Sequence, residues 1–246
     1  MRYLILSDIH ANWEALQATV ADAKGQYDKV LCLGDLVGYG ADPNLVTEWV
    51  REHAEVTVRG NHDKACTGDS VIEWFNPAAQ ASAIWTMDAL TRPNMEYLLY
   101  LPRGPLTVEL FQLVHGSPLD EDEYIIETGD AEEVVQSVGH QVTFFGHTHV
   151  QGGFAVLRGD AVRLPQPPPE QHEIVLELDE SETYLINPGS VGQPRDQDWR
   201  AAYVIYDPEQ RLVRYRRVVY DVGSARRKIL STGAPQILAD RLRMGM

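Results

Sequence analysis

Short apolar runs alternate with amphipathic stretches along the first 65 residues of the chain. The runs Arg2–Ser7, Lys29–Leu33 and Glu55–Val58 have the length and composition of buried strands. The stretches between them, from about Trp13 to Lys24 and from about Pro43 to Glu52, carry apolar residues at helical spacing. Strands and helices in this order predict crossover connections and an α/β arrangement.

The pattern changes in the middle of the chain. Residues 77–101 are helical in character with a break at Arg92-Pro93, and we expect a helical hairpin there. Strands dominate further on, because short apolar runs are separated by turn residues. The predicted strands are Leu106–Val114, Val142–Phe145, Gly153–Leu157, Glu173–Leu178 and Thr183–Ile186. We therefore expect helices to flank two packed sheets.

The last third of the chain carries a proline cluster and a strand pair. Residues 164–170 contain four prolines, which cannot donate to a central ladder, so we expect a surface loop. Ala201–Tyr206 and Leu212–Tyr220 are predicted strands joined by a proline-containing turn, and Pro235–Arg243 is a predicted helix. The two strands would either cover the sheet or pair with a second copy of the chain, which leaves a homo-oligomer open.

Composition narrows the class of protein. The 246 residues are 44% hydrophobic and 23% charged, typical of a folded protein, and we interpret residues 1–246 as one domain. The formal net charge of −15 argues against long nucleic acid as a partner, since Lys and Arg clusters bind phosphate backbones. The first apolar run is too short for a signal peptide or membrane helix, so we expect a cytoplasmic protein without a membrane partner. The cysteines Cys32 and Cys66 form no pattern of a disulfide framework or thiolate site.

Five of the predicted strands or apolar runs lead directly into residue types that bind metals. These residues are Asp8 and His10, Asp35, Asn61 and His62, His115, and His147 and His149. Ligand sites gather at strand ends in α/β sheets. Taken singly, an aspartate after a strand is commonly a turn or helix cap, and a lone histidine is more often a core residue. The set as a whole indicates a metal centre.

Spacing supports this interpretation. One residue separates Asp8 from His10 and His147 from His149, and in extended backbone such residues point the same way. We expect each pair to act as a two-pronged clamp. Glycines stand beside these residues, where the chain must turn sharply and let ligands approach the backbone. They are Gly34, Gly60, Gly116 and Gly146.

In order along the chain, the motifs Asp-x-His, Gly-Asp, Gly-Asn-His-Asp, His-Gly and Gly-His-Thr-His resemble those of the calcineurin-like metallophosphoesterase superfamily, especially its small bacterial and archaeal phosphodiesterase-like members. The resemblance covers about residues 3–200. It implies a four-layer α-β-β-α sandwich of two mixed sheets flanked by helices. It also implies a dinuclear centre in which one ion is bound by Asp8, His10 and His149, the other by Asn61, His115 and His147, with Asp35 bridging them.

These ligand types suit Mn²⁺, Fe, Zn²⁺, Ni²⁺ or Co²⁺ and do not select among them. Two such ions, roughly 3.5–4 Å apart, would share a hydroxide that attacks phosphorus. By the same resemblance, His62 contacts the phosphate and acts as general acid toward the leaving oxygen. We expect a phosphoesterase for small, nucleotide-like phosphodiesters or phosphomonoesters. The alternatives are a dinucleoside polyphosphate hydrolase and a non-catalytic metal-binding scaffold.

Two further residues are candidate substrate contacts. Asn12 matches a position often polar in the family and would touch solvent or substrate, whereas capping of the following helix is an equal alternative. Arg195 would bind a substrate phosphate if the loop of residues 187–196 folds over the metals. For Arg195 the alternative is a surface salt bridge with Asp196 or Asp198.

The run from Gly34 to Gly40 departs from the Gly-Asp-x-Val-Asp-Arg-Gly motif of the superfamily's protein Ser/Thr phosphatases. It lacks the second aspartate and the arginine, which argues against protein phosphatase activity and removes the carboxylate that orients the histidine in those enzymes. Asp63 is the candidate for orienting His62 here. Tyr39 and Trp74-Phe75 would form a wall of the pocket, or else pack the helical hairpin.

Overall fold

The computed structural model describes residues 1–246 and contains two mixed six-stranded sheets. The first sheet contains β1 (Tyr3–Leu6), β2 (Lys29–Cys32), β3 (Ala54–Thr57), β9 (Glu173–Glu177), β11 (Ala201–Asp207) and β12 (Leu212–Val218). The second contains β4 (Leu106–Val108), β5 (Phe111–Leu113), β6 (Val142–Phe144), β7 (Gly152–Leu157), β8 (Asp160–Arg163) and β10 (Thr183–Asn187). The strand orders are β3-β2-β1-β11-β12-β9 and β4-β5-β6-β10-β7-β8.

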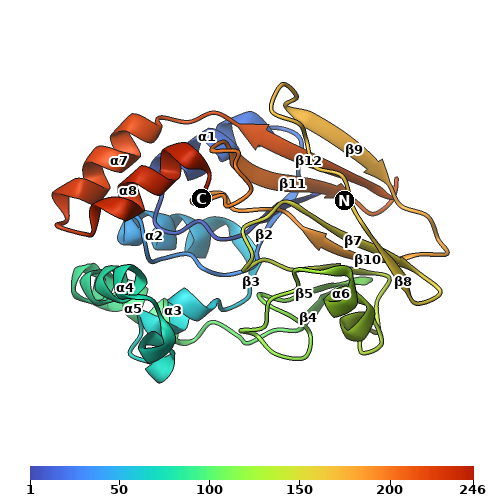
Figure 1. Cartoon of the computed structure of the whole chain (residues 1–246), viewed down its shortest axis with the longest axis horizontal. Helices are drawn as coiled ribbons and strands as arrows, with labels where there is room; N and C mark the ends of the chain where they lie inside the picture. Colours follow the sequence, from blue (N-terminus) through green and yellow to red (C-terminus); the bar gives the residue numbers. More distant parts are fainter.

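Helices cover the outer faces of both sheets (Figure 1). They are α1 (Trp13–Ala23), α2 (Pro43–His53), α3 (Asn61–Ala65), α4 (Pro77–Ala89), α5 (Arg92–Leu99), α6 (Thr128–Val135), α7 (Val222–Ser231) and α8 (Gln236–Met244), with a 3₁₀ turn at Ser70–Trp74. Most of them lie on the side of the first sheet, and α6 lies on the second. None of these helices has the length and apolar character needed to cross a membrane.

The apolar core is divided into three layers by the alternation of side chains along the strands. On β1, Leu4 packs toward the helices whereas Tyr3 and Ile5 pack between the two sheets. On β10, Ile186 faces the first sheet and Leu185 faces α6. Because successive strand residues point to opposite faces, each sheet buries both of its sides. The predicted α-β-β-α sandwich is confirmed.

Most predicted elements are present with ends shifted by one or two residues, but Leu106–Val114 is not a single strand. It forms the hairpin β4–β5, in which Glu109 has a left-handed φ of 51° and Leu110 is 85% exposed. The apolar character of the run concealed this turn. The sequence interpretation also missed β8 and the helices α3, α6 and α7.

The later segments connect the two sheets. Strand β8 lies at the edge of the second sheet and β9 at the edge of the first, so residues 164–170 carry the chain between them as the predicted loop. Strands β11 and β12 pair within the first sheet, between β1 and β9, so both are interior strands of that sheet. The two helices predicted over residues 77–101 are present as α4 and α5, and both pack against α2.

The parallel part of each sheet positions the site. In the first sheet β1, β2 and β3 are parallel, and in the second β5, β6 and β10 are parallel. The carboxyl ends of parallel strands lie along one edge, where the loops that follow them meet. Six loops from distant parts of the sequence therefore converge at one place.

Candidate metal centre

All seven predicted ligands and His62 lie in the loops that follow these parallel strands. The first sheet contributes Asp8 and His10 after β1, Asp35 after β2, and Asn61 and His62 at the start of α3; the second contributes His115 after β5, and His147 and His149 after β6. Every one of these residues is buried, with at most 8% of its surface exposed. The centre thus lies where the loops of the two sheets meet.

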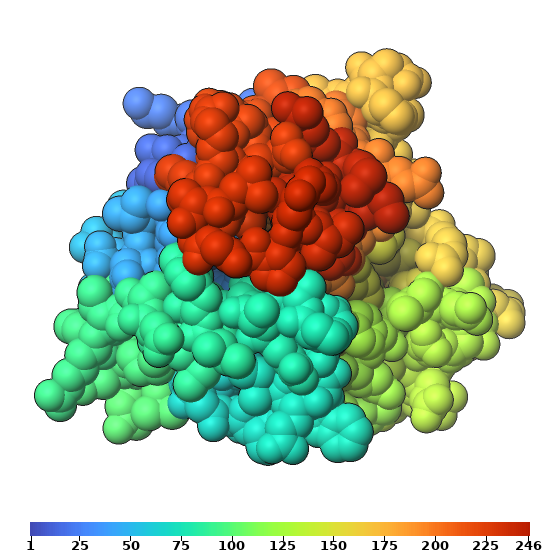
Figure 2. Space-filling view, turned by 60° about the vertical axis from the view of Figure 1, so that its left-hand side comes forward, coloured from blue at the N-terminus to red at the C-terminus, as the bar shows by residue number.

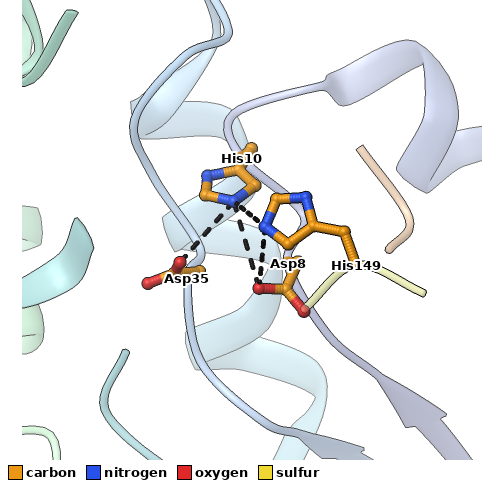
Figure 3. Close-up of side chains that lie close together, drawn as sticks. All are labelled: Asp8, His10, Asp35 and His149. Atoms are coloured by element: carbon orange, nitrogen blue, oxygen red, sulfur yellow. Dashed lines mark hydrogen bonds and ion pairs between the residues drawn. The ribbon is translucent and has the colours of Figure 1, made fainter. Parts of the chain in front are cut away.

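One group of side chains converges around Asp8 (Figure 3). The Oδ1 atom of Asp8 lies 3.3 Å from Nε2 of His149 and 4.0 Å from Nε2 of His10. The two Nε2 atoms are 3.1 Å apart, and His10 Nε2 is 3.6 Å from Oδ2 of Asp35. Four potential ligand atoms from three separate loops, those after β1, β2 and β6, therefore lie close together.

A second group shares Asp35 with the first. Oδ2 of Asp35 lies 3.5 Å from Nε2 of His115, and these residues form a compact cluster with His147. The Oδ1 atom of Asn61 is 3.1 Å from the same His115 nitrogen. Asp35 is the member common to both groups, so one carboxylate oxygen can contact two cations.

Backbone carbonyls fix the orientation of the imidazole rings. The Nδ1 atoms of His10, His115 and His149 lie within hydrogen-bond distance of the carbonyl oxygens of Val37 (2.9 Å), Leu33 (2.7 Å) and Gln193 (2.6 Å). A carbonyl accepts only from a protonated nitrogen, so Nε2 keeps its lone pair and faces the centre. His147 is reversed, since its Nε2 lies 3.1 Å from the carbonyl oxygen of Asp122, which leaves Nδ1 as the free nitrogen.

The carboxylates carry buried oxygen atoms that no protein donor satisfies. Oδ2 of Asp8 accepts from the Ser7 hydroxyl (2.6 Å) and the His147 amide (3.2 Å), and Oδ1 of Asp35 accepts from the His62 amide (2.8 Å). The other oxygen of each carboxylate, Oδ1 of Asp8 and Oδ2 of Asp35, has no hydrogen-bond partner. Leaving such an atom unpaired is costly, and a cation at each group would satisfy it. The residues therefore fit divalent ions of the transition series.

The protonation of three of the four histidines favours the same conclusion. Burial lowers the pKa of His10 and His149 well below the usual value, and that of His147 to about 3, so these rings are neutral ligands near pH 7. Burial also opposes protonation of His115, but the adjacent Asp35 carboxylate outweighs burial and raises the pKa of His115 to about 10. A cation that binds this nitrogen displaces the proton.

The clamp geometry expected from extended backbone is wrong. Asp8 and His10 have left-handed φ values of 53° and 49°, and His147 and His149 have values of 65° and 60°. Asp8 and His10 still reach the same group, whereas His147 and His149 separate into the two groups. Local turns, and not the alternation of a strand, aim these side chains.

His62 lies beside the two groups and is held by aromatic contacts. Its ring centroid is 4.4 Å from that of Tyr39 and 4.5 Å from that of Phe75, and its buried Nδ1 has no partner. Burial lowers the pKa of His62 to about 4. The prediction that Asp63 orients this ring is wrong, because the Asp63 carboxylate accepts hydrogen bonds from backbone amides of residues 35, 36 and 60.

A pocket of about 170 Å³ opens onto the centre. Its lining includes Asp35, Asn61, His62, His147 and His149 together with Tyr39, Trp74, Phe75, Asn76, Ala79, Tyr124, Arg195 and Arg241. Tyr39 and Trp74-Phe75 thus form a wall of the pocket, which confirms that alternative. Sequence reasoning missed Tyr124, whose ring stacks on His147 at 3.8 Å, and Arg241 from α8. Neither residue stands in a motif.

The two candidate substrate contacts differ in outcome. Arg195 lines the pocket and pairs with neither Asp196 nor Asp198, which pair with Arg217 and Arg200, so the salt-bridge alternative is wrong. Asn12 caps α1 by accepting from the Ala15 amide (3.1 Å), which confirms the capping alternative. Its amide group donates to the Gly192 carbonyl (2.9 Å) and the Tyr220 hydroxyl (3.3 Å), so each polar end has a protein partner.

Comparison with known proteins agrees with this geometry. The model of the calcineurin-like phosphoesterase superfamily domain matches residues 1–211. An uncharacterized protein of Methanocaldococcus jannaschii is 34% identical over 98% of this chain and 97% of its own length. A metallophosphoesterase from Sphaerobacter thermophilus has a crystal structure that is 36% identical, with a TM-score of 0.87 over 100% of this chain and 99% of that one. A hypothetical protein from Pyrococcus horikoshii, 20% identical, shares the fold with a TM-score of 0.80 over 100% and 98% of the two chains. The chain belongs to the calcineurin-like phosphoesterase superfamily.

Proposed function

We propose that the protein is a dinuclear metal-dependent hydrolase of small phosphodiesters or phosphomonoesters such as nucleotides. The observation that carries the proposal is the unpaired, buried Oδ2 atom of Asp35, which belongs to both groups of potential ligands. We assign one ion to Asp8, His10 and His149 and the other to Asn61, His115 and His147, with Asp35 between them. The negative net charge of −15 disfavours long nucleic acid and favours small substrates.

When bound, the two cations would activate a water molecule and offset the negative charge that develops on the phosphoryl group. The chain's own contribution is to position the substrate and to move a proton. The lowered pKa leaves His62 neutral at pH 7 before substrate binds. A phosphate placed beside the ring would raise that pKa, because a nearby negative charge favours the imidazolium. His62 would then deliver its proton to the leaving oxygen.

Two alternative functions can be distinguished from the proposed one. A dinucleoside polyphosphate hydrolase would use the same centre with a longer anionic substrate. A non-catalytic metal-binding scaffold would need neither His62 nor the open pocket, yet His62 lies in the wall of that pocket with a free nitrogen. Those two features support an enzyme.

The test is hydrolysis of bis-p-nitrophenyl phosphate against p-nitrophenyl phosphate by chelator-treated protein reloaded separately with Mn²⁺, Ni²⁺ and Zn²⁺. We expect metal-dependent turnover, and His62→Ala should lower kcat by about 10²–10⁴-fold while both ions still bind. His53→Ala is the matched control, since His53 is exposed on α2. Faster diester cleavage would identify a phosphodiesterase. Protein that binds two equivalents of metal but turns over neither ester would contradict the proposal.

A further inference from the structure

Two arginines face the pocket without an aspartate or glutamate partner. Arg195 and Arg241 line the same pocket, and neither is paired with an acidic side chain, although the chain has 36 acidic residues against 21 basic ones. Nη2 of Arg195 donates to the Gln193 side chain (3.1 Å) and the Tyr39 hydroxyl (3.4 Å), while its buried Nε has no partner. The Nε atom of Arg195 and the Nη groups of Arg241 are guanidinium donors without an acidic side chain beside them, and an anion bound in the pocket would satisfy them.

The two arginines reach the pocket from parts of the chain that are fastened to each other. Arg195 lies in the loop after β10, and Arg241 lies on α8. The end of α8 is joined to that loop by a hydrogen bond from the Gln197 amide to the Gly245 carbonyl (2.9 Å). The Arg241 Nε atom donates to the main-chain oxygen of Met246 (2.9 Å), the last residue, and its two Nη groups have no protein partner and are available for a ligand. This junction positions both positive groups before any ligand binds.

Electrostatic coupling agrees with the geometry. Burial and the neighbouring charge of Arg195 lower the pKa of Arg241. The same pocket is also lined by residues of the 3₁₀ turn and the start of α4. Figure 2 shows the C-terminal segment, in red, lying directly against the segment around residues 60–100. Two like charges held together at the edge of a pocket repel each other, and an anion between them would remove that repulsion.

We propose that Arg195 and Arg241 form a subsite for a second phosphate group, so that the preferred substrates are esters of a diphosphate or longer phosphate chain. The inference rests on the proposed function only in that the first phosphate occupies the metal centre. Arg195, which contacts Tyr39 next to His62, lies nearer that centre. Arg241 on α8 binds the second phosphate group, which lies farther from the centre. Arg241 is thereby the residue that distinguishes a diphosphate from a single phosphate.

The test is calorimetric binding of methylenediphosphonate and methylphosphonate to protein loaded with Mn²⁺, because neither ligand can be hydrolysed. Binding is compared among wild type, Arg241→Gln, Arg241→Lys and Arg243→Gln. Arg243 is the matched control, since it is an exposed arginine on the same helix. Free Mn²⁺ also binds these ligands, but that effect is the same for every variant and cancels in the comparison.

We expect wild type and Arg243→Gln to bind the diphosphonate at least about ten-fold more tightly than the monophosphonate. Arg241→Gln should lose most of that preference, and Arg241→Lys, which keeps the charge, should retain part of it. Equal preference in Arg241→Gln and Arg243→Gln would overturn the inference, whichever ester the enzyme hydrolyses. Conversely, a preference that depends on Arg241 in protein without esterase activity would support the subsite and contradict the proposed function.

Discussion

Asp63 fastens together two of the loops that form the metal centre, and its removal provides a quantitative test of that arrangement. Its carboxylate accepts from the amides of Asp35 (2.9 Å), Leu36 (2.9 Å) and Gly60 (3.0 Å), with a longer bond from Val37 (3.4 Å), and Asp63 itself is fully buried. In the proposed centre Asp35 would bridge the ions, and Gly60 precedes the potential ligand Asn61. A single side chain therefore sets the distance between the loops after β2 and β3.

The cost of Asp63→Ala follows from the donors it leaves behind. Each buried amide without an acceptor costs about 1–3 kcal/mol, so three of them cost at least about 3 kcal/mol. For a protein of this size that corresponds to a fall in Tm of about 6–12 °C. Asp63→Asn should not rescue the protein, since an NH₂ group in place of Oδ2 would face the amides of Asp35 and Gly60.

The assay combines urea unfolding with metal content after gel filtration. Asp69→Ala is the control, because Asp69 is exposed and accepts from only one amide, that of Val71 (3.0 Å). That cap should be worth about 1 kcal/mol. We expect Asp63→Ala to lose bound metal as well as stability, while Asp69→Ala keeps two equivalents. If the two variants unfold at the same urea concentration, the carboxylate does not hold the loops and the reasoning is refuted.

Two further substitutions test the position of His62 and the contribution of the Glu121 ion pair to stability. A Cβ at Gly38 would lie 2.5 Å from the His62 ring, so Gly38→Ala should lower kcat at least about ten-fold with metal content unchanged. Gly68 is the control, because it has a similar left-handed φ and no atoms nearby, so Gly68→Ala should lower stability alone. Equal kcat in the two variants would contradict the role of Gly38. Burial raises the pKa of Glu121, but the hydrogen bonds and charges of Lys64 and Arg59 outweigh burial and lower that pKa from its ordinary value of 4.5. The unfolded chain then takes up the proton first as the pH falls, so the roughly 1 kcal/mol lost in Glu121→Gln at pH 7 should shrink progressively as the pH falls below 4.5 in urea titrations. A difference that does not shrink as the pH falls would show that charge is not its source.

The seven potential ligands could be predicted because each stands in a local pattern, an apolar strand that leads into a metal-binding residue. Strand length and the parallel order of the sheets then bring the strand ends together. Arg241 and Tyr124 could not be found in this way. Arg241 lies on a helix 46 residues after Arg195, and only the packing of α8 against the loop after β10 brings them to one pocket.

The missed elements have an equally physical cause. The helix α7 buries only Val222, Ala225 and Ile229 among its ten residues, which is too few apolar positions for a clear helical period. The error over Leu106–Val114 is of the opposite kind, because an exposed leucine at position 110 continued the apolar pattern through a turn. Periodicity records which residues are apolar, whereas burial depends on partners distant in the sequence.

The backbone of the potential ligands shows what the sequence pattern predicts and what it leaves undetermined. Five of the seven, namely Asp8, His10, Asp35, His147 and His149, have φ between 49° and 65°. This region costs an L-residue roughly 1–2 kcal/mol, although aspartate and histidine tolerate it better than most residues. Hydrogen bonds of amides and carbonyls around the same residues offset this cost, such as those that the Asp63 carboxylate accepts from the loop of Asp35. The sequence predicts the type of each potential ligand and its position at a strand end. It does not predict the direction of each side chain, because that direction is set by turns that the rest of the fold holds in a strained conformation.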